Sequence, residues 1–225
     1  MTTIVITGAS RGIGRELASQ YAAQGADVIA TCRTQDAADA LKAALGSDAV
    51  TTPILDVSDG ASVSAFASAL GDTPIDVLTN NAGVLGDQFS FGNMDYDAWT
   101  NAFAINTLGP MRVTEALAGN LVEGAKVITI SSQMGSLLRD TQGSYPYRST
   151  KAAVNKVVQL MAHDLKPRSI TCITMHPGWV QTDMGGPSAS ITPEESASGI
   201  RNVIDGLTLA QTGSFIQWNG ETHPW

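Results

Sequence analysis

Short β-branched runs alternate along the chain with segments whose apolar residues recur every three or four positions. This alternation is typical of βαβ units, in which successive strands are parallel and helices cover both faces of the sheet. Seven strands are expected, at residues 4–7, 27–31, 50–55, 75–79, 126–130, 170–175 and 214–217. Helices are expected from Ile13, from Pro146 and from Pro193, the last with a capping box formed by Thr192 and Glu195.

The chain has the size and composition of a single domain. Its 225 residues contain no repeat, low-complexity tract or Pro/Ser-rich linker that would mark a boundary. Hydrophobic residues make up 43% of the chain, which is enough for a sizeable core and excludes intrinsic disorder. We therefore expect an α/β fold over residues 1–225, with a doubly wound, seven-stranded parallel sheet and helices on both faces.

Charge and cysteine usage exclude several function classes. The net charge of −8 makes nucleic acid and anionic membranes poor partners. No apolar stretch approaches the roughly 18 residues that span a bilayer, so a cytoplasmic protein is expected. Cys32 and Cys172 lack the spacing of a zinc site, and the expected strand order places them in opposite halves of the sheet. Neither a metal site nor a disulfide is therefore expected.

A glycine-rich turn, Thr7-Gly-Ala-Ser-Arg-Gly-Ile-Gly14, joins the first strand to the first helix. Its backbone N–H groups and the positive helix end would face one point and form a phosphate cradle. Gly8 would permit the tight turn, Gly12 the approach of an anion, and Gly14 close packing of helix and strand. A turn that contains glycine only for steric reasons is the alternative.

The same turn also matches the G-x-S-x-G elbow of serine hydrolases, with Ser10 as the nucleophile. That interpretation would need Asp183 and His223 as the acid and the base. The elbow follows the first strand, so no preceding loop supplies the second oxyanion donor. A hydrolase is therefore the less favoured of the two interpretations.

Tyr147 and Lys151 lie four residues apart on the helix expected from Pro146, so both side chains project from one face. A tyrosine hydroxyl titrates near pH 10, and an adjacent ammonium favours its deprotonated form. We therefore expect the pKa of Tyr147 to be lowered toward a range useful for proton transfer. An ordinary amphipathic-helix pair is the alternative, but the glycine turn and the pair Ser131-Ser132 favour acid–base chemistry.

Several motifs occur in order along the chain: Thr7 to Gly14, Asp56-Val57, Asn80-Asn-Ala-Gly83, Asn106, Ser131-Ser132, Tyr147-x-x-x-Lys151 and Pro177-Gly178. As a set they resemble the short-chain dehydrogenase/reductase family over essentially the whole chain. The segments 145–155 and 176–186 and the terminal Pro224-Trp225 resemble the branch of carbonyl reductases that includes the sniffer and C-factor proteins. The resemblance implies a Rossmann fold and hydride transfer between a nicotinamide and a small carbonyl or alcohol.

The resemblance also implies four catalytic residues. Tyr147 would be the general acid/base and Ser132 would bind the substrate oxygen. Lys151 would bind the nicotinamide ribose and lower the pKa of Tyr147, while Asn106 would hold a proton-relaying water. We prefer Ser132 to Ser131 because Ser132-x-x-Gly135 matches the usual motif. The spacing to Tyr147 is longer than usual, so the loop 139–145 is expected to shape the pocket.

The second strand ends in Thr31-Cys-Arg33, without the acid that binds the ribose 2′-hydroxyl of NAD. Arg33 and Arg11 offer guanidinium groups to a 2′-phosphate, so NADP(H) is favoured, while Asp36 keeps NAD(H) possible. The expected cofactor-binding residues are Gly8, Ser10, Arg11, Gly12, Ile13, Gly14, Arg33, Asp56, Val57, Asn80, Ala82, Gly83, Tyr147, Lys151, Pro177, Gly178, Val180 and Thr182.

The substrate pocket is expected to be lined by Gln133, Met134, Tyr145, Trp179 and Met184, beneath a candidate lid at residues 178–191. Among the histidines, His163 is expected at the surface, His176 in a structural role and His223 in the tail. Helices at 99–117 and 147–165 resemble the pair through which family members dimerise, which implies a homodimer or homotetramer. A dinucleotide-binding regulatory or signalling protein with negligible turnover is the alternative function, and the complete set of four catalytic residues argues against it.

Overall fold

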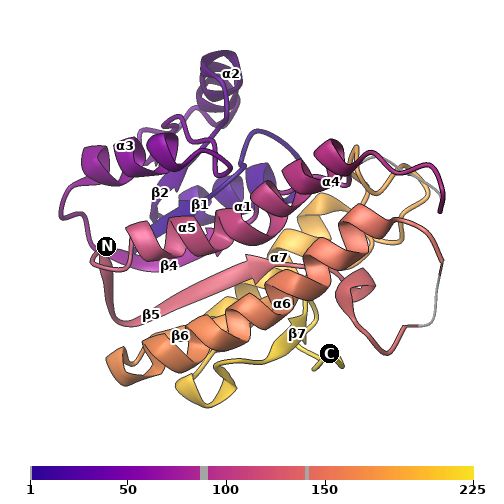
Figure 1. The fold of residues 1–225 in the computed structure, drawn as a ribbon. Coiled ribbons are helices and arrows are strands. Elements are labelled where there is room, and N and C mark those ends of the chain that lie inside the picture. Colours follow the sequence, from indigo (N-terminus) through magenta and orange to yellow (C-terminus); the bar gives the residue numbers. More distant parts are fainter. Residues whose placement is uncertain (1, 87–90, 140–141) are drawn as a thin grey trace.

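A parallel seven-stranded sheet runs through the computed structural model, which describes residues 2–86, 91–139 and 142–225 (Figure 1). The order of strands is β3-β2-β1-β4-β5-β6-β7, and every neighbouring pair is parallel. The strands are β1 (Thr3–Ile6), β2 (Asp27–Ala30), β3 (Val50–Thr51), β4 (Ile75–Asn80), β5 (Leu121–Ile130), β6 (Thr171–His176) and β7 (Phe215–Gln217). The order reverses between β1 and β4, which is where doubly wound folds bind their ligands.

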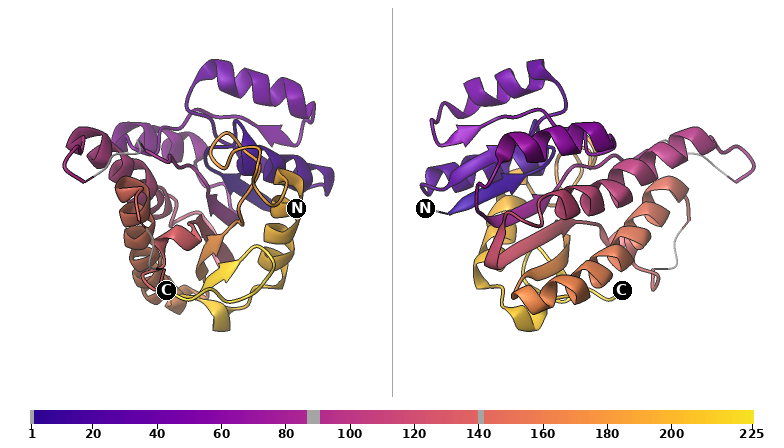
Figure 2. Two further views of the ribbon diagram at one scale, coloured as in Figure 1. Left: turned by 90° about the vertical axis from the view of Figure 1, so that its right-hand side faces the viewer. Right: turned by 60° about the vertical axis from the view of Figure 1, so that its left-hand side comes forward.

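Helices cover both faces of this sheet (Figure 2). They are α1 (Gly12–Ala23), α2 (Gln35–Leu45), α3 (Gly60–Leu70), α4 (Tyr96–Phe103), α5 (Gly109–Ala116), α6 (Tyr145–Leu165) and α7 (Pro193–Gly206). A π-helical turn, Ala104–Leu108, joins α4 to α5, and single 3-10 turns lie at Gln133–Gly135, Lys166–Arg168 and Leu209–Gln211. The expected doubly wound α/β fold is confirmed.

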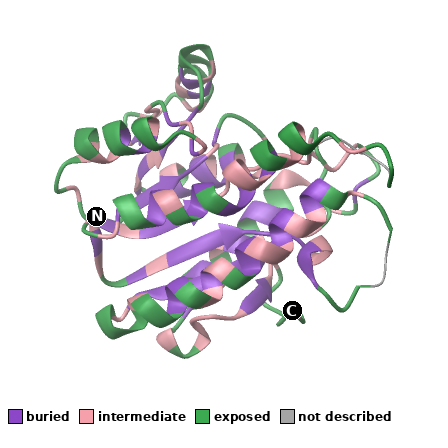
Figure 3. Ribbon diagram, in the orientation of Figure 1, coloured by how far each residue is buried: buried purple, intermediate pink, exposed green. Residues whose placement is uncertain are grey.

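The core consists of two apolar layers, one on each face of the sheet. One layer joins the strands to α1, α2 and α7, and the other joins them to α3, α5 and α6. The strands are therefore buried along most of their length, while the outer faces of the helices are exposed (Figure 3). Within the described residues, no helix combines the length and hydropathy that a bilayer-spanning segment requires. Cys32 and Cys172 are both buried and unpaired, as expected.

Five expected strands agree with the structure to within one residue at each end, and two differ by more. The third was expected at 50–55 but ends at Thr51, because Pro53 has no N–H to donate to a ladder; pairing resumes only as the single bridge between Cys32 and Ile54. The fifth begins earlier than expected, at Leu121, and a register shift against β4 accommodates its extra residues.

The three predicted helix starts are confirmed to within one residue. Thr192 Oγ1 accepts from the N–H of Glu195 at 3.2 Å, and Glu195 Oε2 accepts from the N–H of Thr192 at 2.8 Å, so the capping box at α7 is complete. The helix expected over 99–117 is interrupted by the π-helical turn. Helices α2 and α3, which are rich in alanine, fall in segments between expected strands for which the sequence analysis gave no helix bounds.

Candidate active site

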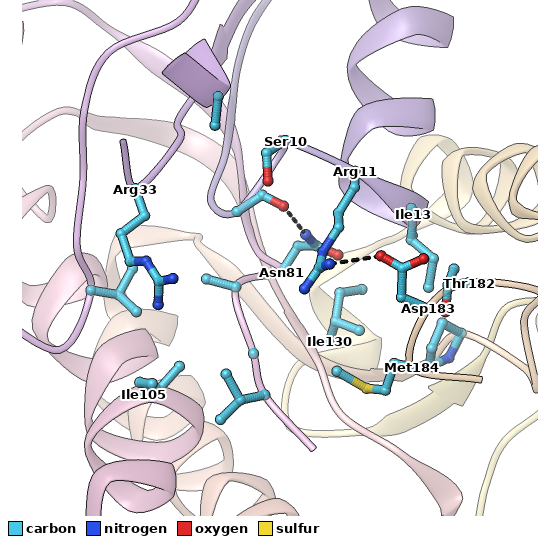
Figure 4. Close-up of a pocket in the computed structure, with 18 of the residues that line it drawn as sticks. Ser10, Arg11, Ile13, Arg33, Asn81, Ile105, Ile130, Thr182, Asp183 and Met184 are labelled. Atoms are coloured by element: carbon cyan, nitrogen blue, oxygen red, sulfur yellow. Dashed lines mark hydrogen bonds and ion pairs between the residues drawn. The ribbon is translucent and has the colours of Figure 1, made fainter. Parts of the chain in front are cut away.

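A cavity of about 770 Å³ lies along the carboxyl ends of the strands, where the strand order reverses. This volume is typical of sites for small molecules and cofactors. The glycine turn after β1, Arg33 after β2, residues 81–84 after β4 and Tyr147 on α6 all contribute to its wall. Figure 4 shows part of this wall, with Arg33 on one side and Arg11, Asp183 and Met184 on the other.

The glycine turn is packed tightly against the segment that follows β4. Gly8 has a φ of +66°, and a Cβ there would lie 2.7 Å from Ala82 Cα, so no larger residue fits. A Cβ on Gly14 would collide with the side-chain amide of Asn81. That amide donates to the carbonyl oxygens of Thr7 and Gly8, both at 3.0 Å. The turn is therefore held in place by Asn81, which lines the cavity and was not among the predicted residues.

The positive end of α1 is open toward the cavity. In the described part of the chain, no side chain caps α1, and its first turn carries no acid. By contrast, Thr34, Asp59, Asp95 and Thr192 cap the helices α2, α3, α4 and α7. Gly12 and Ile13 of the first turn line the cavity, so the unpaired N–H groups and the helix dipole suit a phosphate. The predicted phosphate cradle thus fits the structure.

The two arginines expected at a 2′-phosphate occupy different environments. Arg33 is exposed at the edge of the cavity. A hydrogen bond from Ser58 lowers the pKa of Asp56, and the Arg33 guanidinium contributes to the same shift, so Arg33 faces the acid expected at the adenine. Arg11 instead forms an ion pair with Asp183, 2.6 Å between Nη1 and Oδ2 (Figure 4). Arg11 also lines the cavity, so its contact with a 2′-phosphate stays a prediction, and that contact would compete with Asp183.

Tyr147 and Lys151 project from one face of α6, as their spacing predicted. Both side chains are buried, and Lys151 Nζ lies 5.6 Å from the centroid of the Tyr147 ring. Lys151 Nζ donates to the carbonyl oxygen of Ile130 at 2.8 Å, at the end of β5. The Ser132 side chain, which follows the same strand, is hydrogen-bonded to Tyr147. The end of β5 thus brings these three side chains together.

The pKa of Tyr147 is shifted in the direction opposite to the prediction. Burial raises it, and the hydrogen bond with Ser132 opposes this effect. Burial also lowers the pKa of Lys151 to about 8. The expected acidification of Tyr147 by the Lys151 ammonium is therefore wrong here, because the loss of water around the phenol dominates its pKa and only the Ser132 hydrogen bond opposes it.

Asn106 lies in the π-helical turn and closes the far side of the cluster. Its side chain accepts from the N–H of Val84 at 2.8 Å and donates to the carbonyl of Val84 at 2.8 Å and to Thr150 Oγ1 at 3.0 Å. A Cβ on Gly83 would lie 3.2 Å from Asn106 Oδ1 and 3.6 Å from Lys151 Nζ. Both ends of the Asn106 amide are thus engaged in positioning Val84, and Gly83 provides the room between Asn106 and Lys151.

The two serines after β5 have different partners. Ser131 donates to Asn155 Oδ1 at 2.6 Å, which supports its expected structural role, although it also borders the cavity. Ser132 is not part of the cavity wall, but its side chain contacts Tyr147 and accepts from the N–H of Met134 at 3.1 Å. The direct contact with Tyr147 favours Ser132 as the reactive hydroxyl.

Several predicted residues do not reach the cavity. Asn80 donates to Thr114 Oγ1 at 3.0 Å in the core, so it supports the central strand and contacts no cofactor space. Gly14, Gly178 and Val180 also lie outside the cavity wall. Gly178 has a φ of +89°, and a Cβ there would collide with the Ile191 side chain, while Val180 is buried.

Of the expected substrate pocket, Met184 lines the cavity, whereas Gln133, Met134, Tyr145 and Trp179 lie outside its wall.

Other wall residues were missed. They are Thr34, Ala37, Leu55, Asn81, Val84, Ile105, Ile130, Gln181, Asp183 and Pro193. Three of them had a signal in the sequence: Asn81 lies inside the motif from Asn80 to Gly83, and Gln181 and Asp183 lie inside the candidate lid. The remaining wall residues lie at the cavity because distant segments of the chain pack together there.

The candidate lid at 178–191 is folded on itself. The N–H of Gln181 donates to Ile191 at 2.9 Å, and the N–H of Ile191 donates to Trp179 at 3.1 Å. Trp179 Nε1 donates to the carbonyl of Gly185 at 2.9 Å, so its ring is used within the segment. Gln181, Thr182, Asp183 and Met184 are the residues that this segment presents to the cavity. In the loop 139–145, residues 140 and 141 lie outside the described part of the chain.

The hydrolase interpretation lacks its base at the site, because His223 is not among the described residues that line the cavity with Ser10 and Asp183. Ser10 lines the cavity and Asp183 is paired with Arg11. His223 was expected in the tail, but it is buried, with its ring 4.6 Å from Phe215. His163 is exposed and His176 is buried, as expected.

Comparisons with known proteins agree with this architecture. A family model described as short chain dehydrogenase matches residues 2–191. The chain is 45% identical over 139 residues to the C-signal protein of Myxococcus xanthus. The matched region covers 60% of this chain and 84% of that protein. It is 37% identical over 232 residues, and 100% of both chains, to 1-hydroxy-2-glutathionyl-2-methyl-3-butene dehydrogenase of a Rhodococcus species.

Solved structures show the same relationship. NADPH-bound carbonyl reductase from chicken fatty liver superposes with a TM-score of 0.91 at 30% identity, covering 100% of this chain and 99% of that one. Carbonyl reductase Sniffer of D. melanogaster gives a TM-score of 0.90 at 27% identity, covering 100% of both chains. Because the family model matches residues 2–191, and the same fold recurs in these reductases, the chain belongs to the short-chain dehydrogenase family of oxidoreductases.

Proposed function

We propose that the protein is an NADP(H)-dependent oxidoreductase that transfers a hydride between the nicotinamide and a small carbonyl or alcohol substrate. One observation carries this proposal: a single cavity joins the uncapped end of α1 and Arg33 to the buried face of Tyr147 and Lys151. A phosphate-binding end and a proton-donating end in one cavity are what this reaction requires. The NADP-bound carbonyl reductases among the structural neighbours support the same choice.

The residues present fit such a cofactor. The N–H groups at the start of α1 would hold its central phosphates, and Arg33 would hold a 2′-phosphate. Asp56 and Val57 would flank the adenine, and Lys151 would bind the nicotinamide ribose beside the space that Gly83 leaves open. The bound cofactor would supply or accept the hydride, which no side chain of the protein can do.

Tyr147 would act as the proton donor in carbonyl reduction. Because burial raises its pKa, the phenol is protonated at neutral pH, which is the form that can protonate a developing alkoxide. Ser132, which contacts Tyr147, would hydrogen-bond the same substrate oxygen and align it. Asn106 would keep Val84 and the adjacent Gly83 in place.

The alternative of a dinucleotide-binding regulatory protein with negligible turnover is kept because of the 45% identity to a protein named C-signal. Purified protein tested with NADPH and a panel of aldehydes, ketones and quinones separates the two. Oxidation of NADPH that depends on a carbonyl supports the enzyme. Tight binding of NADPH without turnover on any member of the panel supports the regulatory protein instead.

The oligomeric state stays a prediction. Leu108 in the π-helical turn, Met111 on α5 and Leu160 on α6 are exposed, which suits the expected packing of two copies through this part of the surface. Sedimentation of the wild-type protein and of a Leu160→Asp variant tests this: a homodimer or homotetramer that dissociates in the variant supports the expectation, and a wild-type monomer contradicts it.

A further inference from the structure

The last residues of the chain fold back onto the sheet next to the proposed active site. After β7, the N–H of Gln217 donates to the carbonyl of Glu221 at 2.7 Å, and a single antiparallel bridge joins Ile216 to Thr222. The N–H of His223 then donates to the carbonyl of Phe215 at 2.7 Å. Residues 221–225, which we call the tail, therefore run back along β7 (Figure 1).

Ring contacts anchor the tail to the sheet. The Trp225 ring lies 5.5 Å from that of Phe215, and the His223 ring lies 4.6 Å from Phe215 and 5.8 Å from His176. Phe215 and His176 are buried on adjacent strands, and His223 is itself 8% exposed. Aromatic pairs at these distances add to the stability gained from burial, so the tail has a defined position.

The anchored tail contacts the segment that carries Ser132. Ser136, which is buried, donates from its hydroxyl to the carbonyl oxygen of Trp225 at 3.0 Å. We call residues 132–136 the Ser132 turn: it begins at Ser132, which caps it, and ends at Ser136. The tail therefore holds the end of a turn whose first side chain contacts Tyr147.

Helix α6 holds the opposite side of the Ser132 turn. A Cβ on Gly135 would lie 2.7 Å from the carbonyl carbon of Lys151, so the turn rests directly on the helix. Asn155 donates to the carbonyl of Gly135 at 3.3 Å. The turn is thus held between the tail and the helix that carries Tyr147.

We propose that the tail is a positioning element of the active site: Trp225, through Ser136, sets the position of the Ser132 turn and hence of the Ser132 hydroxyl relative to Tyr147. This inference rests on the proposed function of Tyr147 and Ser132. A hydroxyl that must align a reacting oxygen loses much of its effect when it is displaced by a fraction of an ångström to one ångström. Residues far from the chemistry therefore influence the rate through the turn.

The first test compares two serine variants. Ser136→Ala removes the hydrogen bond to Trp225, and Ser214→Ala is the matched control, because Ser214 also donates to a backbone carbonyl, that of Gln211 at 2.5 Å, but lies at the amino end of β7. We expect Ser136→Ala to lower kcat by about ten-fold, with the Kd of NADPH unchanged and the control equal to wild type.

Two further readouts separate positioning from general destabilisation. Trp225→Ala should lower kcat as Ser136→Ala does, and Trp225→Phe should restore it, because a phenyl ring can still pack on Phe215. The Ser132 hydrogen bond lowers the pKa of Tyr147, so a displaced turn should move the pH profile of kcat to higher pH. A role in stability alone would leave this profile in place.

Amide hydrogen exchange provides a test that does not depend on turnover. Ser136→Ala also removes the acceptor of the Leu138 N–H, which lies 3.3 Å from Ser136 Oγ, so the comparison is made at residues 133–136. Exchange there should be faster than in wild type in both Ser136→Ala and Trp225→Ala, and unchanged in Ser214→Ala. If exchange or kcat in Ser136→Ala equals that of the control, the tail does not position the site and the proposal is overturned. If the wild-type protein reduces no carbonyl, the proposed function fails, and the exchange comparison alone decides whether the tail holds the turn.

Discussion

Lys151 lies one turn beyond Tyr147 on α6, with its ammonium nitrogen 5.6 Å from the centroid of the Tyr147 ring and 2.8 Å from the carbonyl oxygen of Ile130. The ammonium is thus bound to the end of β5 while it faces the aromatic ring. Burial lowers the pKa of Lys151 to about 8 and raises that of Tyr147. Below pH 8 the pair therefore consists of a charged ammonium and a neutral phenol.

Replacing Tyr147 by phenylalanine removes the proposed proton donor and keeps the buried ring. We expect kcat for carbonyl reduction to fall by about 10²- to 10⁴-fold, which is the usual contribution of a general acid. The Kd of NADPH, measured by fluorescence titration, should stay within a factor of two or so of wild type. Tyr96→Phe, at an exposed position on α4, is the control and should behave as wild type. Unchanged turnover in the Tyr147 variant would remove this residue from the mechanism.

Replacing Arg33 by aspartate should change the preference between cofactors. Arg33 lines the cavity, and losing a charge-assisted contact to a 2′-phosphate costs about 1.5–3 kcal/mol, or roughly 10- to 100-fold in the Kd of NADPH. NADH lacks this phosphate, so its Kd should change much less. Arg15→Asp on the exposed side of α1 controls for net charge. An equal loss of affinity for both cofactors would show that Arg33 does not bind the phosphate.

The ion pair between Arg11 and Asp183 predicts a variant that binds NADPH more tightly, in contrast to the weaker binding expected for Arg33→Asp. Both side chains are largely exposed, 78% and 74%, and such a pair is worth about 0.2–1 kcal/mol. Asp183→Asn should release Arg11 toward a 2′-phosphate and tighten NADPH binding by up to about five-fold at low salt. The gain should diminish at high salt and be absent with NADH. Equal tightening of NADPH and NADH would contradict this explanation.

His176 predicts a loss of stability in acid. Burial, with smaller contributions from His223 and Arg139, lowers its pKa from 6.5 to about 4. Between these values the unfolded chain binds a proton that the folded protein does not, so the free energy of unfolding falls as the pH is lowered from 6.5 toward 4. The slope from this residue is at most about 1.4 kcal/mol per pH unit.

Urea unfolding across this pH range measures the effect. His176→Gln should flatten the dependence of unfolding free energy on pH, whereas His163→Gln, at an exposed position on α6, should leave it as in wild type. Identical slopes in wild type and His176→Gln would show that the proton is taken up elsewhere.

Local patterns were sufficient for the fold. The sequence pattern predicts helices from Ile13 and Pro146, each within one residue of the observed start, and the capping box predicts α7, because each pattern depends on neighbours within a few residues. The end of β3 also had a local cause in Pro53, which the expected range 50–55 overlooked.

The candidate site was only partly predictable. The four-residue spacing of Tyr147 and Lys151 gave their common face, and the glycine turn indicated the cradle. The hydrogen-bond and ion-pair contacts that shape the site could not be predicted from such local patterns. Asn81 reaches Gly8 across 73 positions, Asp183 reaches Arg11 across 172, and Ser136 reaches Trp225 across 89.

The amino-acid sequence alone determined the alternation of strands and helices, the glycine turn after the first strand and the helix face that carries Tyr147 and Lys151, because backbone geometry and side-chain periodicity act over short distances. Tertiary structure alone decided the pairing of Arg11 with Asp183, the docking of the tail on the Ser132 turn, and the direction in which the pKa of Tyr147 moves. These properties depend on which distant segments exclude water from a group, and that is settled only when the whole chain is packed.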